Sequence, residues 1–152
     1  MRRTAFIGHR DAYLSVEDSR RLREIVEKLI ASGCKCFTMG THGNFDRVAL
    51  SVCKEVRKTH PEIKIEVVLS SFHMMTKDEY GYSPYEDVDT VMYDVEEVHY
   101  KRQIIYSNRR MIDNSDTLIC YIREWQSWGG ARAIMEYAKR KGLRIINIAD
   151  KK

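Results

Sequence analysis

Residues 4–40 read TAFIGHRDAYLSVEDSRRLREIVEKLIASGCKCFTMG, and this segment contains a strand, a helix and a second strand in succession. The short apolar segments 4–8 and 34–39 each end at a glycine and are predicted as strands. Between them, apolar residues recur every three or four positions, which predicts an amphipathic helix. Ser15 and Asp18 have the spacing of a capping box, so the helix is predicted to begin there.

The same alternation continues along the chain. Further strands are predicted at residues 63–69, 91–95, 117–122 and 144–148, and further helices at residues 45–56, at residues 97–114 and after Gly129-Gly130. Continuous apolar strands joined by crossover helices are typical of a parallel sheet covered on both faces. The sequence therefore predicts an α/β fold: a three-layer, Rossmann-like domain with a mostly parallel sheet.

The length of 152 residues and the mass of 17.9 kDa fit a single domain spanning residues 1–152. Within it, residues 70–90 show no periodicity and are predicted to form an irregular loop. A loop of this length in a small domain is typically functional. Packing of the loop against another subunit is the alternative interpretation.

The charge balance argues against a general nucleic-acid-binding protein. The formal net charge is 26 minus 22, or +4, and four basic residues lie at the two ends of the chain, at positions 2, 3, 151 and 152. The remainder is close to neutral, which disfavours nucleic acid and leaves small anionic molecules as expected ligands.

The sequence also predicts a cytoplasmic protein with no membrane partner. No apolar segment approaches the ~18 residues of a membrane-spanning helix, and the apolar residues after Arg3 are too few for a signal peptide. We interpret the cysteines as reduced, buried thiols, because their spacing does not fit a zinc site. They are Cys34, Cys36, Cys53 and Cys120.

Glycine-containing turns follow three of the predicted strands. Ligands of parallel α/β sheets bind beyond the carboxyl ends of the strands, where glycine allows a phosphate to approach the backbone and the next helix points N–H groups at it. Glycines at strand ends also serve simply as turns, but three turns at one edge with an arginine favour an anion or nucleotide site. Its predicted residues are Gly8, His9, Arg10, Gly40, Thr41, His42, Gly43, Asp46, Gly129, Gly130 and Arg132.

Neither common nucleotide fingerprint is present. The first strand is not followed by G-x-G-x-x-G, and the chain contains no G-x-x-x-x-G-K-[ST]. These observations argue against a hydride-transferring dehydrogenase and a P-loop hydrolase, and no cofactor is predicted.

Four segments at these turns resemble the SLOG superfamily, the Rossmann-like group that includes the Smf/DprA and LOG proteins. They are residues 4–10 (TAFIGHR), 39–46 (MGTHGNFD), 106–116 (YSNRRMIDNSD) and 129–138, which begins GGA. The resemblance spans nearly the whole chain. The resemblance implies that a nucleotide or nucleotide-derived ligand binds at the edge of the sheet where the glycine turns lie. It also implies that the protein forms a homo-oligomer. The leading hypothesis is a nucleotide-binding protein, for example a sensor of a nucleotide-derived signal.

The LOG branch implies an enzymatic alternative, a phosphoribohydrolase that cuts the N-glycosidic bond of a nucleotide. In its hallmark P-G-G-x-G-T-x-x-E, Gly129 and Gly130 match the leading glycines and Glu136 matches the glutamate, while Trp128, Arg132 and Ala133 depart from it. Under this hypothesis, the catalytic residues are Glu136 and either Arg109 or Arg110. A solvated glutamate paired with nearby basic residues is the alternative role for Glu136. A DprA-like DNA-handling protein is a third hypothesis, which the near-neutral charge disfavours.

Overall fold

The computed structural model describes residues 2–69, 85–93 and 100–150. Its six strands are β1 (Arg2–Gly8), β2 (Cys34–Met39), β3 (Lys64–Val68), β4 (Asp89–Val91), β5 (Thr117–Tyr121) and β6 (Arg144–Asn147). Its four helices are α1 (Val16–Ala31), α2 (Asn44–Arg57), α3 (Tyr100–Asp113) and α4 (Gly130–Arg140). The strands form one all-parallel sheet in the order β4-β3-β2-β1-β5-β6. The predicted α/β class is therefore confirmed.

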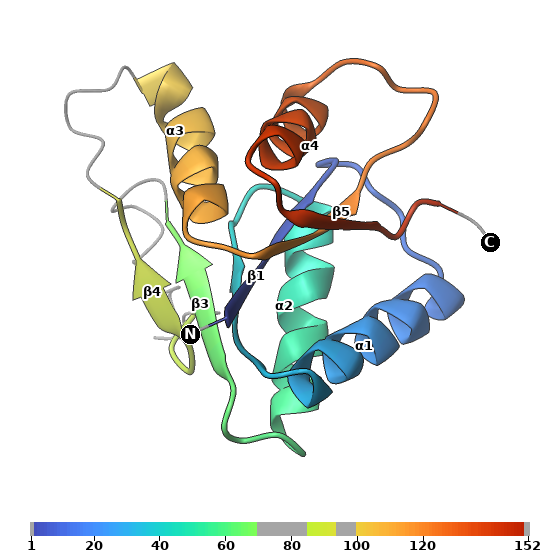
Figure 1. Ribbon diagram of the computed structural model, residues 1–152, viewed down its shortest axis with the longest axis vertical. Helices are drawn as coiled ribbons and strands as arrows, with labels where there is room; N and C mark the ends of the chain where they lie inside the picture. Colours follow the sequence, from blue (N-terminus) through green and yellow to red (C-terminus); the bar gives the residue numbers. More distant parts are fainter. Residues whose placement is uncertain (1, 70–84, 94–99, 151–152) are drawn as a thin grey trace, which may run out of the picture.

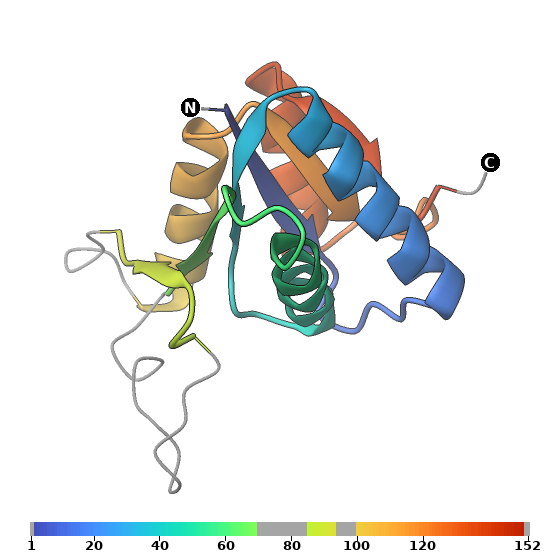
Figure 2. The same ribbon diagram turned by 90° about the horizontal axis from the view of Figure 1, so that it is seen from below.

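The helices lie in two layers, one on each face of the sheet (Figures 1 and 2). On one face, α1 and α2 pack over a core that includes the touching rings of Phe6, Phe37 and Phe45. On the other face, α3 and α4 contribute Met111 and Ile134 to a second core. This arrangement is the predicted three-layer, Rossmann-like architecture.

Local sequence accounts for where the helices begin. In α1, the Ser15 hydroxyl accepts from the Asp18 N–H at 3.0 Å, and the Asp18 carboxylate accepts from the Ser15 N–H at 3.1 Å, which is the predicted capping box. By contrast, α2 and α4 begin after Gly43 and Gly129, and neither has a side-chain cap among the described residues.

The topology reverses beside β1. From β1 the chain proceeds to β2 on one side, and it returns later to place β5 on the other side. Such a switch point opens a crevice beyond the carboxyl ends of the two central strands, which is where ligands of open α/β sheets bind.

Three predicted segments differ from the structure or lie partly outside it. The helix expected at residues 97–114 is described only from Tyr100 and ends at Asp113. The strand expected at residues 91–95 is β4, which is shorter and begins earlier, at Asp89. It lies at the sheet edge beside β3 and carries polar residues, so its sequence lacks the apolar run of the other strands. Of the loop predicted at 70–90, residues 70–84 lie outside the described part of the chain.

Two further predictions from the sequence concern the state of the cysteines and the presence of membrane-spanning helices. The four cysteines are buried free thiols. Within the described residues, the helices are too short or too polar to cross a bilayer.

Candidate functional site

A cleft of about 420 Å³ lies at the carboxyl edge of the sheet, beside the switch point. The loop after β1, the start of α2, the inner face of α3 and the start of α4 form its walls. Eight residues predicted from the sequence line it: Gly8, His9, Arg10, His42, Asp46, Arg109, Gly129 and Gly130.

The starts of α2 and α4 both border this cleft. The first N–H groups of a helix have no partner within the helix, and they carry a partial positive charge. At α2, the first of these groups, the Asn44 N–H, already donates to the Arg10 carbonyl at 2.9 Å. At α4, Gly129 supplies no side-chain cap and Gly130 faces open space, so the first N–H groups of this helix are open to a bound anion. The start of α4 is therefore the position in the cleft best suited to negative charge.

The glycines have different roles in building these walls. A Cβ at Gly8 would lie 2.4 Å from the Phe45 ring, and one at Gly43 would lie 2.5 Å from Cα of Arg10. These two glycines therefore allow the β1 loop and α2 to pack tightly. At Gly130 a Cβ would meet nothing within 4 Å, so here the backbone itself is open toward a ligand.

His9 is held in one tautomer at the base of the cleft. It is 5% exposed, and its Nε2 accepts the backbone N–H of Arg123 at 3.0 Å. A neutral imidazole with that acceptor carries its proton on Nδ1. Burial lowers the pKa of His9, and the Arg123 charge lowers it further. His9 is therefore an uncharged hydrogen-bond donor.

Asp46, in the first turn of α2, supplies a carboxyl group to the cleft. Its Oδ2 accepts the backbone N–H of His42 at 2.9 Å. Burial raises the pKa of Asp46 to about 6, although that hydrogen bond acts in the opposite direction. Burial, and then the charge of Arg10, lower the pKa of His42. Asp46 can therefore gain or lose a proton near neutral pH.

Of the two candidate arginines on α3, Arg109 is the one that reaches the cleft. Its guanidinium lies 5.3 Å from the centre of the Tyr137 ring. Arg110 turns elsewhere and lies 5.6 Å from the centre of the Tyr93 ring. Arg10, which follows β1, also lines the cleft and is exposed.

Two other charged candidates do not line the cleft. The guanidinium of Arg132 donates to the backbone carbonyls of Arg123, at 2.8 Å, and of Gln126. Glu136 is half-exposed and lies 3.9 Å from Arg132 and 3.7 Å from Lys139. Arg132 thus holds the loop before α4, and Glu136 is a paired surface carboxylate.

The turn residues Gly40, Thr41 and Gly43 also lie outside the cleft lining. Gly40 is nevertheless packed beneath it, because a Cβ there would lie 3.2 Å from the Asp46 carboxylate and 3.9 Å from the Asn108 side chain.

Sequence reasoning missed several cleft residues. Asp11, Asn108 and Gln126 add polar groups, and Ile104 and Ile105 form an apolar wall. Asp11 directly follows the segment 4–10, and Asn108 lies within the segment 106–116, so the segments singled out from the sequence could have pointed to both residues. Gln126 lies in a loop without a recognisable motif.

A larger hollow of about 630 Å³ lies between α1 and β6. The described residues that line this hollow include both basic and acidic side chains. None of them is a glycine, and none lies at the start of a helix. Over residues 2–69, 85–93 and 100–150, histidine, cysteine and acidic side chains form no cluster suited to a metal ion. The glycine-edged cleft is therefore the stronger candidate.

Comparison with known proteins adds no further information about this cleft. No protein-family model matches the chain, and a search of curated proteins finds no match.

Proposed function

We propose that this protein binds a nucleotide or a nucleotide-derived small molecule in the glycine-edged cleft. The observation that carries the proposal is the convergence of the open N-terminus of α4 with Arg10 and Arg109 on one cleft. Oriented N–H groups and guanidinium groups are the usual protein partners of phosphate oxygens.

The rest of the cleft suits the sugar of such a ligand. Its volume of about 420 Å³ falls in the range of small-molecule sites. The Asp46 carboxylate can accept from ribose hydroxyls, and the neutral His9 can donate to a ligand oxygen. Ile104 and Ile105 provide apolar contact. The donors, acceptor and apolar wall together match a phosphorylated sugar better than a simple inorganic anion.

The position of Glu136 favours binding over hydrolysis. A carboxylate that stabilises the cleavage of a ribosyl bond must reach the reacting carbon. Glu136 lies outside the cleft lining and pairs with Arg132 and Lys139. We therefore propose a binding or sensing role, in which the ligand is held and not cut.

A thermal-shift panel tests the proposal. Nucleoside monophosphates, NAD and ADP-ribose are each added to the purified protein, and at least one is expected to raise Tm as its concentration passes Kd. Arg10→Ala and Arg109→Ala should each reduce the shift at fixed ligand concentration, because each removes a phosphate partner. Arg110→Ala is the matched control and should keep the full shift, since Arg110 lies against Tyr93.

Two results would contradict the proposal: no compound shifts Tm, or Arg10→Ala and Arg109→Ala respond like the unmodified protein. Chromatography of the same mixtures after incubation should recover each compound intact. Release of free base would instead favour the phosphoribohydrolase alternative.

A further inference from the structure

Two exposed tryptophans lie in the loop between β5 and α4. Trp125 exposes 69% of its surface and Trp128 exposes 61%. Their rings meet edge to face, with centroids 5.9 Å apart and an interplanar angle of 63°. We call these two residues the tryptophan pair. Indole rings gain much stability from burial, so an exposed pair of them is a suitable surface for contact with another molecule.

Two arginines hold the loop that carries the tryptophan pair. Arg132 donates from α4 to three backbone carbonyls of the loop. Arg123 bonds to the side chains of Asp11 and Gln126, both at 3.0 Å, and its guanidinium lies 5.8 Å from the centre of the Trp125 ring. The pair is therefore presented on an ordered backbone, which reduces the entropy lost when a ligand contacts it.

The same loop is a wall of the cleft. Gln126 and Gly129 line the cleft, and Trp128 directly precedes Gly129, after which α4 begins. Figure 1 shows this loop in orange, between β5 and α4. Trp125 and Trp128 themselves lie outside the cleft lining, at the rim that Gln126 and Gly129 form. A ligand with a phosphate at the start of α4 would reach the tryptophan pair by extending over this rim.

We propose that the tryptophan pair is the stacking surface for the base of the bound nucleotide. This inference rests on the proposed function and narrows the ligand from phosphorylated sugars to compounds that carry an aromatic base. Stacking on an indole needs only the face of a base, so purines and pyrimidines are both accepted. The cationic Arg123 beside Trp125 adds an attraction for electron-rich rings.

The test compares AMP and UMP with ribose 5-phosphate, which shares their sugar and phosphate but has no base. Isothermal titration should give roughly tenfold tighter binding of AMP than of ribose 5-phosphate to the unmodified protein. In the Trp125→Leu/Trp128→Leu double variant, AMP should bind no more tightly than ribose 5-phosphate. The affinity for ribose 5-phosphate should stay within about twofold. Tyr13→Leu, which removes an exposed aromatic ring outside this loop, is the matched control and should keep the advantage of AMP.

Tryptophan fluorescence gives a second readout that needs no substitution: AMP should quench it, and ribose 5-phosphate should not. Equal binding of AMP, UMP and ribose 5-phosphate, or an unchanged advantage of AMP in the double variant, overturns the inference and leaves the proposed function standing. Failure of all three compounds to bind contradicts both. Sedimentation adds one further outcome. If the unmodified protein is a dimer, the double variant is a monomer and AMP binding is unchanged, then the tryptophan pair is a subunit contact and the inference is overturned.

Discussion

Asp46 lines the cleft with a carboxyl group whose burial costs stability when the group is charged. Burial favours the neutral form of the carboxyl group and raises its pKa to about 6. In the unfolded chain the same group loses its proton near pH 4. The folded state therefore binds more protons between these two pH values, and the stability that this group contributes is lost as the pH rises from about 4 to about 6.

We predict that Asp46→Asn stabilises the protein at pH 8. The amide carries no charge to desolvate and can still accept the N–H of His42, so the gain should be about 1–2 kcal/mol. The gain should shrink toward zero near pH 4, where Asp46 is protonated in the folded state. Urea unfolding at pH 8, 6 and 4 measures the difference. A gain that is the same at all three pH values would contradict the assignment.

At the scale of secondary-structure elements, the two glycine-edged turns differ in what requires the glycine. Gly8 ends β1 directly against Phe45 of α2, whereas Gly130 begins α4 beside open space. The first glycine is needed for packing between elements, and the second leaves the helix start accessible.

This contrast predicts opposite outcomes for two alanine substitutions. Gly8→Ala should destabilise the protein by about 2 kcal/mol or more, because its methyl group would overlap the Phe45 ring. Gly130→Ala should leave the free energy of unfolding within about 0.5 kcal/mol, and should weaken AMP binding by roughly tenfold by covering the backbone N–H groups. Urea unfolding and isothermal titration measure the two effects. Equal stability of the two variants would contradict this interpretation of the turns.

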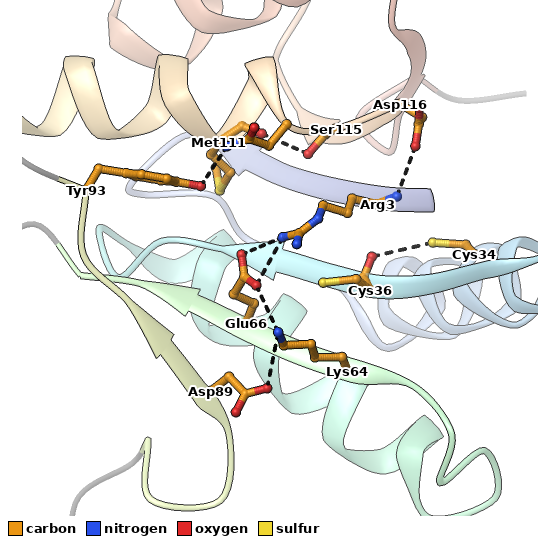
Figure 3. Close-up of polar contacts among 11 residues, drawn as sticks. Arg3, Cys34, Cys36, Lys64, Glu66, Asp89, Tyr93, Met111, Ser115 and Asp116 are labelled. Atoms are coloured by element: carbon orange, nitrogen blue, oxygen red, sulfur yellow. Dashed lines mark hydrogen bonds and ion pairs between the residues drawn. The ribbon is translucent and has the colours of Figure 1, made fainter. Parts of the chain in front are cut away.

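An ion pair between partly buried Arg3 and buried Glu66 joins β1 to β3, and Lys64 extends this network to β4 (Figure 3). Arg3 on β1 reaches past β2 to bind both carboxylate oxygens of Glu66 on β3, at 2.9 and 3.0 Å. Glu66 is only 3% exposed. Lys64 lies 3.6 Å from Glu66 and 3.8 Å from Asp89 on β4, which extends the network to the edge strand.

We predict that Arg3→Met destabilises the protein by about 3 kcal/mol, because it leaves the buried Glu66 carboxylate without its main partner. Adding Glu66→Leu should restore most of the loss, since both charged groups are then gone. Arg20→Met is the control: Arg20 pairs with Glu17 and Glu24 on the surface of α1, and its loss should change stability by less than about 1 kcal/mol. Similar losses for Arg3→Met and Arg20→Met in urea unfolding would rule out this role for the ion pair.

For the whole molecule, the alternation of apolar periods was enough to predict the architecture. Strands and helices could be predicted from the sequence because each has its own spacing of apolar residues, and this spacing depends on residues close together in the chain. Parallel pairing then follows, since each strand–helix–strand unit returns the chain in the same direction. The glycine turns could be placed at one edge of the sheet by the same argument, and the cleft is found there.

Side-chain directions could not be predicted in this way. Arg109 and Arg110 are consecutive on α3, and which of them faces the cleft depends on how that helix packs, with Met111 and Ile112 fully buried. Likewise, Arg132 matched a phosphate ligand by its place in α4, but in the structure it binds loop carbonyls.

The amino-acid order alone thus settled the alternation of strands and helices, the capping box of α1 and the edge of the sheet where glycines gather. The three-dimensional arrangement settled which side chains line the cleft, the place of β4 at the sheet edge, and the exposure of the tryptophan pair. The physical reason is the distance along the chain over which the deciding contacts act. Helix and strand periods arise from contacts a few residues apart, whereas the direction of an arginine or the pairing of a short polar strand depends on residues far away in the chain.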